Sequence, residues 1–153
     1  RRRSLPTEPE WEFAARGGHV SMATQGGVKG QQRSTFRVGN SWQGSFPKEN
    51  LLRDGYAGLS PATAFPPNAL GIYDTLGNAW EWVDGGEPAA RILRGGSFVD
   101  YDPNAPPEGN ASAGKRGKPG RHLTPANHAI TPGTRMVTTQ DSGSANTSFR
   151  CAS

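Results

Sequence analysis

Glycine and proline supply more than a fifth of this 153-residue chain, with 21 glycines and 13 prolines, and this limits how much regular structure it can form. Glycine destabilises helices and strands through its entropy, and proline interrupts them because it has no N–H to donate. Leu, Ile, Val and Phe together make up only about 15% of the chain, which is low for an ordinary core. Four Trp, three Tyr, six Phe and a net charge of only +4 nevertheless argue against disorder. We therefore expect one folded domain with many loops and a thin core.

Local patterns predict one helix and a few short strands. The helix begins near Thr7, a good N-cap, and continues through glutamates that suit the positive end of the helix dipole. It ends about ten residues later at Gly17, which favours the left-handed conformation of a C-terminal cap. Alternating side chains predict a strand over 79–83, and the compositions of 91–99 and 148–151 predict two more.

Two long stretches are predicted to be irregular. Residues 19–68 are interrupted by Gly, Pro, Asn and Ser and show no sustained period. Residues 102–133 are rich in Pro and Gly, and their basic side chains lie mainly in 115–121. Such a segment could contact nucleic acid, but aromatic residues are not interleaved with the charges. We therefore expect a solvated basic loop and no nucleic-acid partner.

The single cysteine, Cys151, excludes several classes of protein. An internal disulfide needs two thiols, and thiolate sites for zinc or iron–sulfur clusters need several. No apolar run approaches the ~18 residues of a membrane span, so we expect no transmembrane segment. Arg1, Arg2 and Arg3 precede a polar stretch and not the apolar core of a signal peptide.

Familiar catalytic motifs are missing from the sequence. His19, His122 and His128 have no partner at metal-ligand spacing, and we expect them to be solvated loop residues. Ser97 follows two glycines, but the lysine and the spacing of a phosphate-binding loop are missing. No G-x-S-x-G elbow marks a nucleophilic serine.

Oxygen donors gather in two places. Asp74, Asn78 and Glu81 lie within eight residues of one another in a glycine-containing segment. Asn40 and Asp54 form a second group across a long turn. A hard cation such as Ca²⁺ prefers six to eight oxygens from carboxylates and carbonyls, which tight loops deliver. Asp-Gly and Gly-Asn are also ordinary turn dipeptides, so composition alone favours turns over metal sites.

Five segments in order resemble the formylglycine-generating enzyme (sulfatase-modifying factor) family. Each reproduces a family motif with few changes: LPTEPEWEFAARGG at 5–18, NSWQGSFP at 40–47, FPPN at 65–68 with GIYDTLGNAWEW at 71–82, RILRGGSF at 91–98, and FRCA at 149–152. The resemblance implies an irregular, loop-rich α+β fold related to C-type lectins, with little regular secondary structure. It identifies residues 1–153 as part of such a domain, with the basic Pro/Gly-rich segment at about 102–133 as an inserted loop.

The family binds calcium, and the resemblance implies two sites here. One would use the side chains of Asn40 and Asp54 with the carbonyls of Ser41 and Tyr56. The other would use the side chains of Asp74 and Glu81 with the carbonyls of Thr75, Gly77 and Ala79. Every side-chain donor type is present at these positions. Ca²⁺ is therefore the expected cofactor.

The catalytic residues of the family are where this sequence departs from it. Family enzymes oxidise a substrate cysteine to formylglycine with O₂ and a Cu(I) ion held by two cysteines. The position of the first cysteine holds Asp100, and that of the second falls near Ala105. Soft Cu(I) prefers thiolates, so no copper and no catalytic residue are expected, although the family's active-site serine is retained as Ser97. Cys151 matches a structural cysteine whose usual partner lies upstream of this chain.

These features together predict a pseudoenzyme that resembles the family's cysteine-less paralogues. We expect a calcium-stabilised binding or structural module whose partner is another protein, within a larger assembly. By resemblance, the expected compartment is the endoplasmic reticulum or another organelle lumen. One rival function is a formylglycine-generating oxidase of sulfatase cysteines whose missing parts come from a second chain, or an iron-dependent sulfoxide synthase. Another rival is a lectin-like module that binds sugar through calcium.

Overall fold

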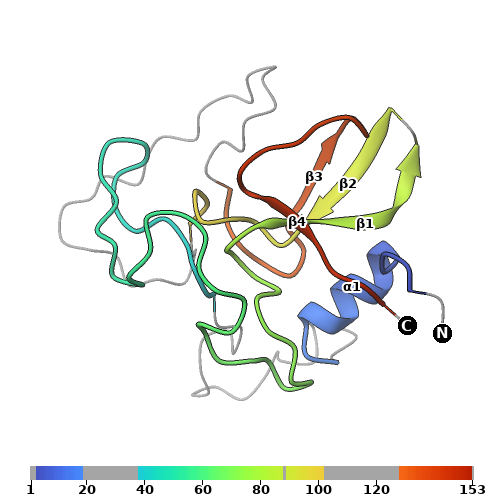
Figure 1. The fold of residues 1–153 in the computed structure, drawn as a ribbon, viewed down its shortest axis with the longest axis horizontal. Helices are drawn as coiled ribbons and strands as arrows, with labels where there is room; N and C mark the ends of the chain where they lie inside the picture. The colour runs from blue at the N-terminus through green and yellow to red at the C-terminus, as the bar shows by residue number, and fades with distance from the viewer. Residues whose placement is uncertain (1–2, 19–37, 88, 102–127, 153) are drawn as a thin grey trace, which may run out of the picture.

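The computed structural model describes residues 3–18, 38–87, 89–101 and 128–152. Within them, an α-helix is followed by strands that belong to one sheet (Figure 1). The elements are α1 (Glu8–Ala15), β1 (Trp80–Glu87), β2 (Ala90–Arg94), β3 (Arg135–Thr138) and β4 (Thr147–Phe149). The rest of the described chain is turns and irregular segments, and this confirms the expected loop-rich α+β class.

The sheet has the order β3-β2-β1-β4. β1 and β2 form an antiparallel hairpin in which Glu81 lies opposite Arg94, and β3 adds antiparallel to β2. β4 pairs in parallel with β1, from Trp80 opposite Thr147 to Trp82 opposite Phe149. The irregular residues 38–60 lie on the far side of the molecule from the β1–β2 hairpin (Figure 1). Predicted strands at 79–83 and 148–151 therefore exist, whereas nothing in the sequence analysis anticipated β3.

Helix α1 begins and ends close to where the sequence predicts. The Glu10 carboxylate accepts hydrogen bonds from the backbone N–H and the hydroxyl of Thr7, both at 2.8 Å, and this contact fixes the first turn. Gly17, with φ of +66°, reverses the chain after the last turn. Trp11 and Ala15 are 1% exposed on the face that meets the sheet.

Arg94 fastens this helix to strand β2. Its guanidinium donates to the carboxylates of Glu8 at 3.0 Å and Glu12 at 2.5 Å, and to the Pro132 carbonyl at 2.7 Å. It also lies 5.4 Å from the centre of the Trp11 ring. Because Arg94 is only 3% exposed, these acceptors compensate for the loss of its hydration.

Strand β2 ends at Arg94, so the prediction of one strand over 91–99 is wrong in its second half. Gly95 and Gly96 have φ values of +98° and +77°, far from the φ of a regular extended strand. A Cβ on Gly95 would lie 3.1 Å from the Trp11 ring and 3.0 Å from the Thr75 carbonyl oxygen. The glycine pair therefore turns the chain tightly over the buried tryptophan and directs Ser97 into the interior.

The core is small, as the composition predicts. Its buried cluster comes from the helix, the hairpin and two loop segments, and consists of Trp11, Ala15, Leu76, Val83, Ile92 and Ile130. Ile130 belongs to the predicted loop at 102–133, of which only 128–133 are described. This end of the loop forms no helix or strand. It still packs into the core, because the buried Ile130 side chain lies against Gly96. The basic segment 115–121 lies outside the described residues.

The two ends of the described chain meet. Ser4 and Ala152 exchange backbone hydrogen bonds of 3.2 and 2.8 Å, and Figure 1 shows the ends side by side. The longest described helix, α1, has eight residues, so no described helix is long and apolar enough to cross a membrane.

Candidate functional site

Ser97 and Asp100 lie together in the interior, just after the glycine pair. Both residues are 0% exposed. One carboxylate oxygen of Asp100, Oδ2, accepts the Ser97 hydroxyl at 2.8 Å and the Ser97 backbone N–H at 2.9 Å. The backbone N–H of Asp100 in turn donates to the Ser97 carbonyl at 2.9 Å. The position that the family resemblance assigns to a copper-binding cysteine thus holds a carboxylate that closes a local turn.

Two residues from distant segments complete this buried polar site. The other carboxylate oxygen of Asp100, Oδ1, accepts the backbone N–H of His128 at 2.6 Å and lies 3.2 Å from its ring nitrogen Nδ1. Asn146 lies in the turn that precedes β4, and its side-chain amide donates to Ser97 Oγ at 2.9 Å. The His128 ring stands edge-on to Trp80, with centroids 5.5 Å apart. Asp100 therefore holds residues 97, 128 and their neighbours together.

The geometry does not support nucleophilic catalysis by Ser97. A serine nucleophile needs a base that takes its proton, usually a histidine that a carboxylate orients. Here the hydroxyl donates directly to Asp100, and His128 bonds the opposite oxygen of the same carboxylate. The bond to Asp100 raises the pKa of His128 above its ordinary value, and partial burial opposes this shift. His128 is a loop residue, as predicted, and its side chain is 39% exposed, but it is not free in solvent because Nδ1 lies 3.2 Å from Asp100. His19 and His122 lie outside the described residues.

The first expected calcium group is assembled in the fold. Asp54 Oδ2 accepts the Ser41 backbone N–H at 2.9 Å, and Oδ1 accepts that of Tyr56 at 3.1 Å. Asn40, which is 0% exposed, donates its amide to the Gly58 carbonyl at 2.6 Å. Its side-chain oxygen Oδ1 is buried with no hydrogen-bond partner in the described chain. A buried oxygen without a donor carries an energetic penalty that a cation would remove, so this group fits Ca²⁺.

The second expected calcium group is only partly suited to a metal. Asp74 Oδ1 is buried and has no partner among the described residues. Both oxygens of Glu81, however, bond the Arg150 guanidinium, and Oε2 also accepts the Trp11 indole N–H at 2.7 Å. Arg150 donates as well to the carbonyls of Tyr73 and Asp74, each at 3.1 Å. A divalent ion at Glu81 would therefore meet a positive charge that already neutralises this carboxylate.

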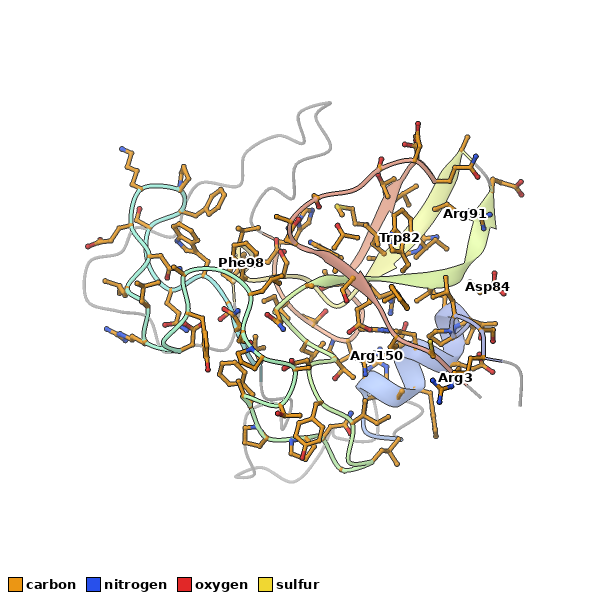
Figure 2. The ribbon with its side chains drawn as sticks, in the orientation of Figure 1. Arg3, Trp82, Asp84, Arg91, Phe98 and Arg150 are labelled. Carbon is orange, nitrogen blue, oxygen red and sulfur yellow. The ribbon has the colours of Figure 1, made fainter. Side chains whose placement is uncertain are left out.

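The residues of this second group differ in their surroundings. Asp74, Ala79 and Glu81 line an open pocket of about 480 Å³, together with Asn78 and Arg150. Thr75 and Gly77 do not line it, and the Gly77 carbonyl accepts the Ala79 N–H at 2.8 Å. Figure 2 shows Arg150 just beyond β4, on the helix side of the sheet. No three His, Cys, Asp or Glu side chains gather as a metal site in the described ranges, so either group would depend mainly on amide and carbonyl oxygens.

Gly77 brings the two oxygen groups close together. Its φ is +82°, and a Cβ built on it would lie 2.4 Å from the Asn40 carbonyl oxygen. That separation is far inside van der Waals contact, so only glycine allows the segments around residues 40 and 77 to pack at this distance. The neighbouring Asn78 then donates its backbone N–H to the same carbonyl at 2.8 Å.

Sequence reasoning missed several residues of these sites. His128, Asn146 and Arg150 lie 28, 49 and 69 residues from their partners Asp100, Ser97 and Glu81, so no local spacing could relate them. The sequence places Asn78 with Asp74 and Glu81 as an oxygen donor, but the resemblance assigns it to neither calcium site. The left-handed Gly-Asn pair at 77–78 was the signal, since Asn tolerates positive φ and bonds its surroundings.

Comparison with known proteins agrees with the sequence motifs. A model of the sulfatase-modifying factor enzyme 1-like domain matches residues 2–153. The inactive C-alpha-formylglycine-generating enzyme 2 of Mus musculus is 44% identical over 158 residues, which span 100% of this chain and 44% of that protein. The formylglycine-generating enzyme of Thermomonospora curvata is 38% identical over 148 residues, which span 97% of this chain and 48% of that protein. This chain thus covers less than half the length of these relatives.

Solved structures show the same fold. PvdO from Pseudomonas aeruginosa superposes with a TM-score of 0.57 at 20% identity, over 98% of this chain and 52% of PvdO. CarF superposes with a TM-score of 0.54 at 21% identity, over 97% of this chain and 46% of CarF. The relation to C-type lectins stays a prediction. Motifs, fold and domain model agree that the chain belongs to the sulfatase-modifying factor family, which includes formylglycine-generating enzymes and their inactive paralogues.

Proposed function

We propose that this chain is a non-catalytic, calcium-stabilised binding or structural module that works within a larger protein assembly. The observation that carries the proposal is the fully buried Asp100 at the expected copper-ligand position. Both of its oxygens are occupied by donors from Ser97 and His128, so the site is filled by the protein itself. A carboxylate bonded in this way supports a structural role for Asp100 rather than a copper-binding one.

Two further facts support a non-catalytic role. The chain has one cysteine, Cys151, which is exposed and lies beyond β4. A two-thiolate Cu(I) site therefore needs thiols that this chain does not hold. Relatives at 44% and 43% identity carry the name inactive C-alpha-formylglycine-generating enzyme 2.

Calcium is proposed first at the group formed by Asn40, Ser41, Asp54 and Tyr56. The unpartnered Asn40 Oδ1 supports it, as does the Asp54 carboxylate that bonds both neighbouring segments. The group of Asp74, Thr75, Gly77, Ala79 and Glu81 is proposed second, because Arg150 shares Glu81. When bound, Ca²⁺ would supply a crosslink between loops that have little core to hold them.

A protein partner is the proposed occupant of the exposed apolar surface beside the pocket. Phe149 on the edge strand β4 is 64% exposed, and Tyr73 is 40% exposed. Exposed aromatic side chains beside a polar pocket are typical of protein interfaces. A location in the endoplasmic reticulum or another organelle lumen stays a prediction of the family resemblance.

Removal of calcium is expected to lower the melting temperature of the chain. A ligand that binds only the folded state stabilises it by about 2.7 kcal/mol at 100 times its Kd, or about 5–10 °C for a domain of this size. The measurement is thermal unfolding in calcium and in excess EDTA.

The matched variant for this experiment is Asp54→Asn. It keeps one acceptor oxygen for either the Ser41 or the Tyr56 N–H group and removes the charge that attracts the ion. In EDTA it should melt somewhat below the wild type, because one of the two N–H groups loses its acceptor, and its melting temperature should rise little with calcium. Identical wild-type curves in calcium and EDTA would contradict the proposal.

A further inference from the structure

Asn78 links the two oxygen groups through every polar atom of its side chain. Its Oδ1 accepts the Asn40 amide at 3.1 Å and the Ser60 backbone N–H at 2.9 Å. Its Nδ2 donates to Asp74 Oδ2 and to the Ser60 carbonyl, both at 3.2 Å. Its backbone N–H and carbonyl bond Asn40 and Phe98. One residue therefore joins four segments that are distant in sequence.

These bonds decide which oxygens remain free. Asn40 uses its Nδ2 on Asn78 and Gly58, so the opposite end of its amide, Oδ1, is left without a donor. Asp74 uses Oδ2 on Asn78, and its Oδ1 is left without one. Both are buried oxygens of the proposed calcium groups that lack a partner in the described chain. Each belongs to a residue whose other polar atom is held by Asn78.

We infer that Asn78 is a positioning residue for calcium, which orients Asn40 and Asp74 so that each presents one oxygen to the ion. This inference rests on the proposed calcium function and deepens it. Asn78 contributes no ligand itself, because its own Oδ1 is used by Asn40 and Ser60. A substitution at this position therefore weakens calcium binding at both groups together.

The experiment compares calcium affinity in the full chain, measured by calorimetric titration with calcium chloride. Asn78→Gly is the informative variant, because φ at Asn78 is +64° and glycine keeps this backbone while removing the side chain. We expect its calcium affinity to fall at least about tenfold, which corresponds to the free energy of roughly one charge-assisted hydrogen bond. Ser60→Ala is the matched control, since it removes a buried hydroxyl without a described partner and leaves the backbone bonds to Asn78. Its affinity should stay within about twofold of the wild type.

A second readout separates positioning from general stabilisation. If Asn78 only stabilises the fold, the melting temperature of the glycine variant should lie below that of the wild type by the same amount in calcium and in EDTA. Positioning instead predicts a larger loss in calcium, because the variant also loses binding energy. Equal losses, or an unchanged affinity in a wild type that binds calcium, would overturn this inference alone. A wild type that does not bind calcium would overturn the proposed calcium function as well.

A measurement on the wild type keeps the inference testable if the glycine variant does not fold. The Ser60 N–H bonds Asn78 and no proposed ligand. Calcium is expected to slow the hydrogen exchange of this amide at least about tenfold, because the ion makes local opening around Asn78 less favourable. If calcium protects Ser41 and Tyr56 but leaves Ser60 unchanged, Asn78 does not position the ligands.

Discussion

Asp100→Ala is expected to lower the free energy of unfolding by about 3–5 kcal/mol, the cost of removing one partner from a buried charged network. The variant deprives the Ser97 hydroxyl and the backbone N–H groups of Ser97 and His128 of their acceptor, at positions from which water is excluded. Chemical denaturation with the wild type in parallel gives this difference.

Asp100→Asn is the control, because it keeps the shape and one carbonyl oxygen. It should lose less stability than the alanine variant, since fewer of the donors are left without an acceptor. A change of under about 1 kcal/mol for Asp100→Ala, as at an ordinary surface position, would show that Asp100 does not organise this site.

Glu81→Ala is the second substitution with a large expected effect, again about 3–5 kcal/mol. Glu81 is 6% exposed and receives both the Arg150 guanidinium and the Trp11 indole N–H. Its removal takes the carboxylate from Arg150 and leaves the buried Trp11 N–H without an acceptor, at the junction of α1, β1 and the end of β4. Denaturation in EDTA measures this loss apart from any loss of calcium.

The control for Glu81 is a double-mutant cycle with Arg150→Ala. Because the two side chains contact each other, the double variant should lose less stability than the sum of the single losses. Additive losses would mean that the ion pair contributes nothing. Glu81→Gln should be milder than Glu81→Ala, since its amide oxygen still accepts the Trp11 N–H.

Local features of the sequence predicted the parts of the fold that short-range physics determines. The capping residue Thr7, the glutamates of the first turn and Gly17 fix α1 through contacts within a few residues. The scarcity of large apolar residues likewise predicted a small core. The motifs identified the family. The end of β2 was misplaced because the close approach of Gly95 to Trp11 depends on a residue 84 positions away.

The candidate sites were predictable only where neighbours in sequence are neighbours in space. Asp54 bonds the backbone N–H groups of Ser41 and Tyr56 across one turn. The calcium site that the resemblance assigns to them together with Asn40 stays a prediction. The role of Asp100 was not predictable, because its partner His128 follows after a 26-residue stretch that the structure does not describe. The ion pair of Arg150 with Glu81 was likewise not predictable, since it depends on the parallel register of β4 with β1.

The central claim is that Asp100, at the position of a family copper-binding cysteine, makes a structural contact and takes no part in catalysis. An assay for formylglycine tests this claim most directly. The full chain is incubated with Cu(I), O₂ and a cysteine peptide, with the Thermomonospora curvata relative as positive control, and aldehyde is captured with a hydrazide probe. We expect the relative to modify the peptide while this chain leaves the cysteine intact. Aldehyde formation by this chain would contradict the non-catalytic role and favour an oxidase.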